Sequence, residues 1–339
     1  MRTTDARLVT LSLVLGVIAC SPDDVEPDVR SQYVDLYLDD EIEVCAGQLD
    51  AYDLFIEQAF GVWTGGPPGD FRANMRVLTE SSCSHGGSCA HEGTARLFGQ
   101  RAQYHELSHL LHQATDGRSA YVLNEAVAEG LGPLFPYTFG PDRLETYDFL
   151  FADPLNLTIN DHGRLAMLAR FLIEQYGPDS FRALFRAFID VQQPTQDHFE
   201  QEFEAAVGAS LNEAWSAFSS AARCPFDLWY CDVRDLHENF AEVHGLDCSA
   251  PQTMGFLTTK SELQYEYRPY TIVHLHVTEE REFEMEFSNW GWFTRCGTCS
   301  EGQDMTPWPL VLEEGIYAFI LPQNPDQPLH FSIRPTWTE

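Results

Sequence analysis

The stretch that most constrains the fold of this chain is residues 104–132, which contains two histidines and a glutamate in the order His-Glu-x-x-His. On an α-helix, residues four positions apart lie one turn above each other, so His105 and His109 can direct their imidazoles at one ion. Glu106 falls between them and is placed to act as a general base on water. The motif therefore requires a helix here and predicts a metal site on its surface.

A second acidic segment, Asn-Glu-Ala-Val-Ala-Glu at residues 124–129, follows almost at once. A catalytic zinc takes three protein ligands and leaves one position for water, so we expect a carboxylate of this segment as the third ligand. Its two glutamates, Glu125 and Glu129, lie one helical turn apart. Between the two segments, Gly117 is expected to end the first helix and Ser119 to cap the second.

Together, HELSH and NEAVAE resemble the gluzincin type of zinc metallopeptidase, in which a glutamate on the next helix completes an H-E-x-x-H site. The resemblance implies that the zinc ligands are His105, His109 and Glu125. It also implies that Glu106 is the catalytic base and that Glu129 holds His105 in place. Fifteen residues separate His109 from Glu125, slightly fewer than is usual in the thermolysin-like and aminopeptidase-like branches, so the connecting turn must be tight. No G-x-M-E-N segment precedes the motif, which favours an endopeptidase over an aminopeptidase.

Two other histidines, His112 and His162, are candidates for a role at this site. His112 does not complete a metzincin pattern, because it stands where that pattern needs glycine and Thr115 stands where it needs histidine, so we interpret His112 as a core or helix-flank residue. His162 begins a helix predicted over residues 161–177, with Asp161 as its cap. Gluzincin-type peptidases often carry a metal-facing tyrosine there, and the hypothesis is that His162 stabilises the oxyanion instead. The alternative is a solvent-exposed residue at a helix start.

The N-terminus indicates export. Two arginines precede an apolar run over residues 8–18, which is too short to span a membrane, and Val-Ile-Ala-Cys then resembles the bacterial lipobox. The resemblance implies that residues 1–20 are a lipoprotein signal peptide and that Cys20 carries lipid. An ordinary cleaved signal is the alternative. Residues 21–30 form an acidic tether, and Ser21 favours the outer membrane as the destination.

The amino-acid composition limits the classes of partner that this protein can bind. The formal net charge of −32 excludes a nucleic-acid footprint and argues against direct binding to anionic lipid, so we expect membrane attachment through the N-terminal lipid only. Besides Cys20, eight cysteines remain, an even number that suggests up to four disulfides in an oxidising compartment. The pairs nearest in sequence are Cys83–Cys89, Cys224–Cys231 and Cys296–Cys299. The last is alternatively a redox or zinc pair.

The pattern of elements predicts an α+β protein in two domains. Alternation and helical periodicity indicate strands at residues 33–38, 73–79 and 93–98 and a helix at residues 48–63, ahead of the two metal helices. The strand at residues 93–98 is expected at the edge of the substrate cleft. Further helices are predicted at residues 181–189, 197–207 and 211–222, and strands at residues 271–277, 281–287, 310–312 and 316–321. Residues 31–223 would be a thermolysin-like catalytic domain with a small N-terminal sheet and a helical lobe, and residues 224–339 a disulfide-containing β-sandwich.

These observations predict a monomeric, lipid-anchored zinc endopeptidase that acts on peptides or proteins. An alternative belongs to another class: a non-catalytic, zinc-stabilised lipoprotein that binds an envelope or extracellular partner through its β domain. The presence of Glu106 favours the enzyme, because a purely structural zinc site has no use for a base at that position. In the β domain, Trp290, Trp292 and Trp308 suggest either a carbohydrate platform or the sandwich core, and the core is favoured.

Overall fold

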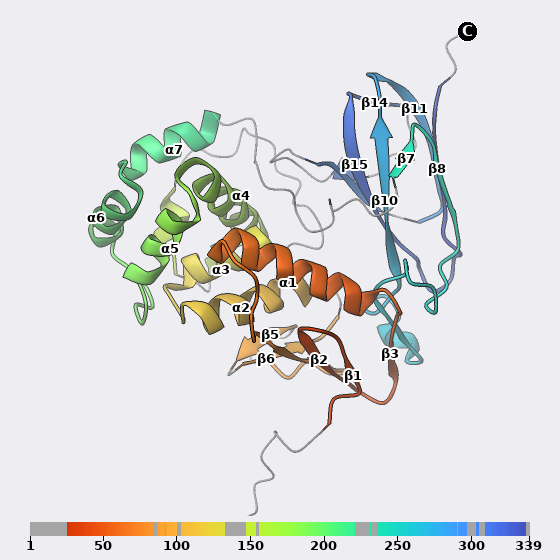
Figure 1. Ribbon diagram of the computed structural model, residues 1–339, viewed down its shortest axis with the longest axis horizontal. Coiled ribbons are helices and arrows are strands. Elements are labelled where there is room, and N and C mark those ends of the chain that lie inside the picture. Colours follow the sequence, from red (N-terminus) through yellow and green to blue (C-terminus); the bar gives the residue numbers. More distant parts are fainter. Residues whose placement is uncertain are drawn as a thin grey trace, which may run out of the picture.

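The computed structural model describes residues 26–83, 87–91, 93–99, 103–132, 147–153, 156–220, 231, 236–289, 291–296, 303–304 and 309–336. Over these residues the chain is an α+β protein with seven α-helices and four sheets. Figure 1 shows a small sheet beneath helices α1 and α2, a group of helices on one side and a β-sandwich on the other. The predicted signal peptide and Cys20 lie outside the described residues. In the part that is described, no helix is long and apolar enough to cross a membrane.

The small sheet has the strand order β1-β2-β4-β6-β5. Its three central strands run parallel, and each edge strand pairs antiparallel with its neighbour. The bounds are β1 (Val29–Arg30), β2 (Val34–Leu38), β4 (Ala73–Val77), β5 (Cys89–His91) and β6 (Thr94–Leu97). The three predicted strands are confirmed, but the strand before the metal helix is not at the edge, because the short strand β5 pairs outside β6. The edge strand on this side of the sheet is therefore β5.

The helices cover this sheet and continue into a helical lobe. They are α1 (Gln48–Thr64), α2 (Gln103–Thr115), α3 (Tyr121–Leu131), α4 (Ile159–Tyr176), α5 (Pro178–Ala187), α6 (Gln196–Val207) and α7 (Leu211–Ser220), with a 3-10 turn at Asp148–Phe151. All the predicted helices are present. Two predicted caps are wrong. Helix α4 is capped by Thr158, with Asp161 completing the capping box, and α3 has Ala120 at its N-cap because the Ser119 hydroxyl donates to the Phe185 carbonyl instead.

The C-terminal part contains two sheets that pack face to face, with orders β13-β12-β15-β10-β7 and β14-β11-β16-β8. The strands are β7 (Leu236–Glu238), β8 (Ala241–His244), β10 (Tyr270–Val277), β11 (Arg281–Phe287), β12 (Trp292–Arg295), β13 (Gln303–Asp304), β14 (Leu310–Leu312), β15 (Gly315–Pro322) and β16 (His330–Pro335). Alternating residues of both sheets, such as Phe283, Phe319 and Phe331, form a separate apolar core. Trp292 is buried, as a core residue should be, whereas Trp290 and Trp308 lie outside the described residues.

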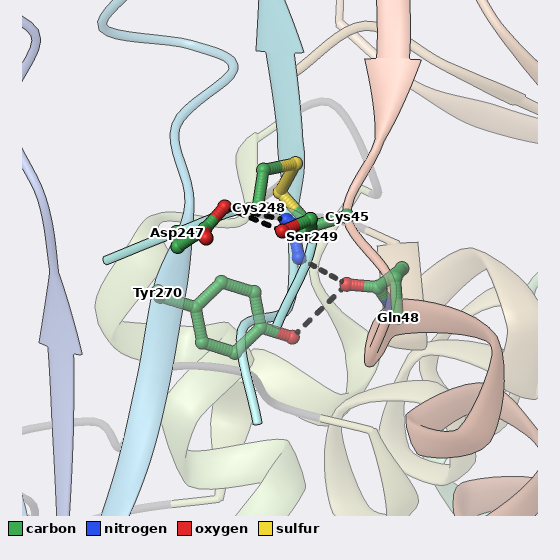
Figure 2. Close-up of a disulfide and its surroundings, with 7 residues drawn as sticks. Cys45, Gln48, Asp247, Cys248, Ser249 and Tyr270 are labelled. Atoms are coloured by element: carbon green, nitrogen blue, oxygen red, sulfur yellow. Dashed lines mark hydrogen bonds between the residues drawn. A yellow bond between two sulfur atoms is a disulfide. The ribbon is translucent and has the colours of Figure 1, made fainter. Parts of the chain in front are cut away.

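The β-sandwich is joined to the helical part by covalent and non-covalent contacts. Strand β3 (Ile42–Val44) pairs with β9 (Phe256–Thr258), next to a disulfide between Cys45 and Cys248 that Figure 2 shows beside Gln48 and Tyr270. Tyr270 belongs to the same hydrophobic cluster as helices α1 and α2. The predicted domain boundary at residues 223–224 lies outside the described residues. What the structure shows is that the two halves share a core.

The disulfides only partly follow sequence proximity. Of the pairs nearest in sequence, Cys83–Cys89 is a disulfide. Cys231 bonds to Cys296, so the pairs Cys224–Cys231 and Cys296–Cys299 do not form, and Cys296 does not belong to a free redox or zinc pair. The cause is the fold, which brings the Cα atoms of Cys231 and Cys296 to 5.7 Å, within the range for a disulfide, although 65 positions separate them in sequence.

Candidate metal centre

The candidate centre is built on the contact between helices α2 and α3. Leu107 and Leu111 of α2 are buried and fix which face of the helix points inward. The C-terminal end of α3 comes very close to the start of α2, because Gly132 has no side chain: a Cβ there would lie 2.3 Å from the Tyr104 carbonyl oxygen. This approach brings the carboxylates of α3 over the histidines of α2.

The three predicted ligands meet in the structure. The Nε2 atoms of His105 and His109 are 3.0 Å apart. The Glu125 carboxylate spans them, with Oε2 lying 3.4 Å from His105 Nε2 and Oε1 lying 3.5 Å from His109 Nε2. In a tetrahedral zinc site with bonds of about 2.0 Å, ligand atoms lie about 3.3 Å from one another. The three donor groups therefore lie close enough together to hold one metal ion.

Glu129 and His162 also lie at this centre, and Glu129 lies on the Nδ1 side of His105. Glu129 Oε1 is 3.2 Å from His105 Nδ1, which is within ion-pairing reach. The same oxygen is 3.3 Å from Nδ1 of His162, and that nitrogen is 3.6 Å from Glu125 Oε2. Glu125 thus faces the two Nε2 atoms, while Glu129 faces the other edge of the His105 ring. Both glutamates therefore lie beside His105, on different edges of its ring.

The side chains of the centre are buried, and their charges shift one another's pKa values. Burial raises the pKa of Glu106 to about 7, with His105 acting to lower it and the neighbouring glutamates to raise it. Burial opposes charge on His105, but Glu129, followed by Glu125 and Glu106, outweighs burial and raises the pKa of His105 to about 10. A hydrogen bond to Glu129 raises the pKa of His162. Without a metal, protonated imidazoles balance the buried carboxylates.

Sequence reasoning placed His112 in the core and missed its contact with a ligand. His112 is 0% exposed, and its Nε2 lies 3.0 Å from Nδ1 of His109. Burial lowers the pKa of His112 to about 4, so the ring is neutral near pH 7. The signal was available, because residues 105, 109 and 112 follow the i, i+4, i+7 spacing of a single helix face.

Two tyrosines differ in their relation to the centre. Tyr121 lies one turn before Glu125 on α3. Burial, followed by the charges of Glu125, Glu129 and Glu106, raises the pKa of Tyr121 to about 12. Sequence reasoning did not consider this residue. The second is Tyr147, which donates its hydroxyl hydrogen bond to Asn212 of α7.

Comparison with known proteins adds little. No protein-family model matches the chain, and no curated protein matches it in sequence. Among solved structures, it is similar to Legionella pneumophila aminopeptidase A in complex with aspartic acid, with 11% sequence identity and a TM-score of 0.30. The match covers 87% of this chain but only 34% of that one, so the chain spans about a third of that structure's length. A likeness at this level carries no inference about activity.

Proposed function

We propose that this protein is a zinc-dependent metallopeptidase of the gluzincin type that hydrolyses peptide bonds. One observation carries the proposal: His105, His109 and Glu125 present three donor groups 3.0–3.5 Å apart beside the buried carboxylate of Glu106. Three ligands and an adjacent base are what a catalytic zinc site needs. When bound, zinc would polarise the scissile carbonyl and lower the pKa of water.

Each neighbouring side chain has a definite task in this proposal. Glu106 accepts a proton from the attacking water and delivers it to the leaving amine, and its pKa of about 7 suits transfer in both directions near neutral pH. Glu129 holds the His105 ring so that its Nε2 faces the ligand cluster. His162, whose raised pKa favours the charged form, offers positive charge to the carbonyl oxygen as negative charge develops there.

The wider setting belongs to the same proposal. The protein would be a monomeric endopeptidase with a thermolysin-like catalytic part, held at the bacterial cell envelope by lipid on Cys20. Peptides or proteins outside the cytoplasm would be its substrates. A non-catalytic, zinc-stabilised lipoprotein is the competing function. The burial of Glu106, which is only 5% exposed, favours the enzyme. Ionising a buried carboxyl costs free energy, and a purely structural zinc site gains nothing from such a group.

The test compares the metal content and peptide hydrolysis of the purified protein with those of two variants. We expect one zinc per chain in the wild type and its loss in Glu125→Ala. The exposed Glu204 provides a matched control, because Glu204→Ala removes a carboxylate from helix α6 instead. Glu106→Gln should keep the zinc and lose about 10²–10⁴-fold of the hydrolysis rate.

Three outcomes would separate the alternatives. A wild type that takes up no zinc after metal is added back refutes the metal site. Zinc uptake without hydrolysis of a broad mixture of peptides supports the structural lipoprotein. Loss of zinc in Glu106→Gln would mean that Glu106 is needed to form the site, and would overturn its assignment as the base.

A further inference from the structure

We infer that His112 is a positioning residue for the metal site, acting through a hydrogen-bond relay that runs from the Gly117 carbonyl through His112 to His109. The inference rests on the proposed function, because it concerns a ligand of the proposed zinc. It assigns His112 a role that neither the H-E-x-x-H motif nor the third-ligand segment includes.

The relay is defined by two contacts. His112 Nε2 lies 3.0 Å from His109 Nδ1, and His112 Nδ1 lies 3.4 Å from the Gly117 carbonyl oxygen. The carbonyl can only accept, so the proton of a neutral His112 resides on Nδ1. Its Nε2 is then an acceptor, and His109 must donate from Nδ1. This leaves the lone pair of His109 on Nε2, the atom that faces His105 and Glu125.

The position of the proton on His109 matters because a neutral histidine has two tautomers of similar energy. A ligand histidine whose proton can move to Nε2 offers no lone pair to the metal for part of the time. His105 has the Glu129 carboxylate at its Nδ1 edge. His112 occupies the corresponding place at His109, so each predicted histidine ligand has a polar group beside its Nδ1, on the side away from the ligand cluster.

The surroundings hold His112 in this place. It is fully buried, and its ring meets the ring of Phe185 edge-on at 5.2 Å between centroids. Gly117 follows the last turn of α2 with φ of +91° and donates its N–H to the carbonyls of His112 and Gln113. This left-handed conformation is one that glycine adopts without strain. The turn that ends the metal helix therefore also supplies the terminal acceptor of the relay.

The test measures the affinity of the purified protein for Zn²⁺ alone, by competition with a chelator, in variants that separate shape from hydrogen bonding. His112→Phe keeps a ring against Phe185 but cannot accept a hydrogen bond. His112→Gln places its amide oxygen at the same number of bonds from Cα as Nε2 and can accept from His109. We expect His112→Phe to bind zinc about 10–100-fold more weakly and His112→Gln to stay at the wild-type value.

Thermal unfolding of the metal-free proteins controls for misfolding. If His112→Phe does not fold, His112→Asn replaces it, because the asparagine oxygen is one bond shorter and does not reach His109. Nitrogen-15 shifts of the imidazoles give a second readout: the wild-type zinc form should show His109 protonated at Nδ1. Folded variants that all bind zinc as the wild type does, or His112→Gln weakened as much as the variant without an acceptor, would overturn the relay. A wild type that binds no zinc would instead refute the proposed function.

Discussion

Replacing Gly132 with alanine should damage the metal centre without touching a ligand. A Cβ at this position would lie 2.3 Å from the carbonyl oxygen and 2.6 Å from the carbonyl carbon of Tyr104, the residue before His105. The Ser108 hydroxyl, which donates to the same carbonyl, would be 2.6 Å away. Because two of these atoms are backbone, no rotamer change relieves the overlap. The end of α3 and the start of α2 must therefore move apart.

The distance by which α2 and α3 must separate follows from the overlap of the added Cβ with Tyr104. Real Cβ atoms stay at least 3.0 Å from other heavy atoms, so the two helices must separate by roughly 0.7 Å, the difference between 3.0 and 2.3 Å. Overpacking of a core costs about 1–3 kcal/mol of folding free energy. The separation also moves Glu125 relative to His105 and His109. A misplacement of about 1 Å at a catalytic centre can cost about 100-fold in rate, so we expect the zinc affinity to fall by at least about tenfold.

The assay pairs zinc affinity with thermal unfolding of the metal-free form, and Gly61→Ala is the matched control. Gly61 lies inside α1, and a Cβ there meets no atom within 4 Å. Gly61→Ala should stabilise the fold by about 0.5–1 kcal/mol and leave zinc affinity unchanged, because alanine is the better helix former. If Gly132→Ala matched the wild type in both measurements, the close approach of α2 and α3 would not be what positions the site.

Two further predictions concern stability and pH. Replacing Cys45 and Cys248 with serine should cost about 5 kcal/mol of unfolding free energy, against about 2 kcal/mol for Cys83 and Cys89, because the first disulfide closes a loop of 203 positions and the second a loop of 6. Equal losses in denaturant titrations would contradict the loop-entropy argument. Zinc must displace a proton from His105, whose pKa is about 10 in the metal-free form, so affinity should rise about tenfold per pH unit between pH 6.5 and 8.5. Glu129→Gln removes the main charge that raises this pKa and should flatten the slope, and a wild-type affinity independent of pH would refute the assignment.

Most of the secondary structure could be predicted, because the patterns that indicate a helix or a strand lie within that element itself. Alternation in β11 and the apolar periodicity of α4 come from burial of one face, which the sequence displays directly. The sequence patterns did not indicate the six-residue strand β16 or the short strands β5 and β9. β5 and β9 have three residues each, too few to show a period, and they pair with β6 and β3, which the tertiary fold places beside them.

The sequence was enough to predict which side chains gather at the candidate site, but not all of the contacts around them. His105, His109 and Glu125 stand in a recognisable spacing, because helical geometry alone brings the first two together. The place of Tyr121 near the centre depends on how α2 and α3 pack, which no spacing within one helix reveals, whereas the contact between His109 and His112 follows from their spacing on α2. The limit that applies to Tyr121 also applies to the disulfides. The tertiary fold brings Cys231 and Cys296 together, and sequence proximity does not show this pairing.

The β-sandwich takes part in holding the metal helix. Tyr104, the residue before His105, has its hydroxyl 3.0 Å from that of Tyr270 on β10, and it accepts a hydrogen bond from Gln48 of α1. The Gln48 oxygen in turn accepts from the backbone N–H of Gly255, beside the Cys45–Cys248 disulfide shown in Figure 2.

These hydroxyl and amide groups are buried, so each hydrogen bond that is lost leaves a polar atom that neither water nor the protein can hydrogen-bond. A shift of the sandwich relative to α1 would break several of them at once, at the position next to the first metal ligand. The C-terminal half therefore stabilises the start of helix α2. Removing the sandwich should therefore also unfold the candidate metal centre.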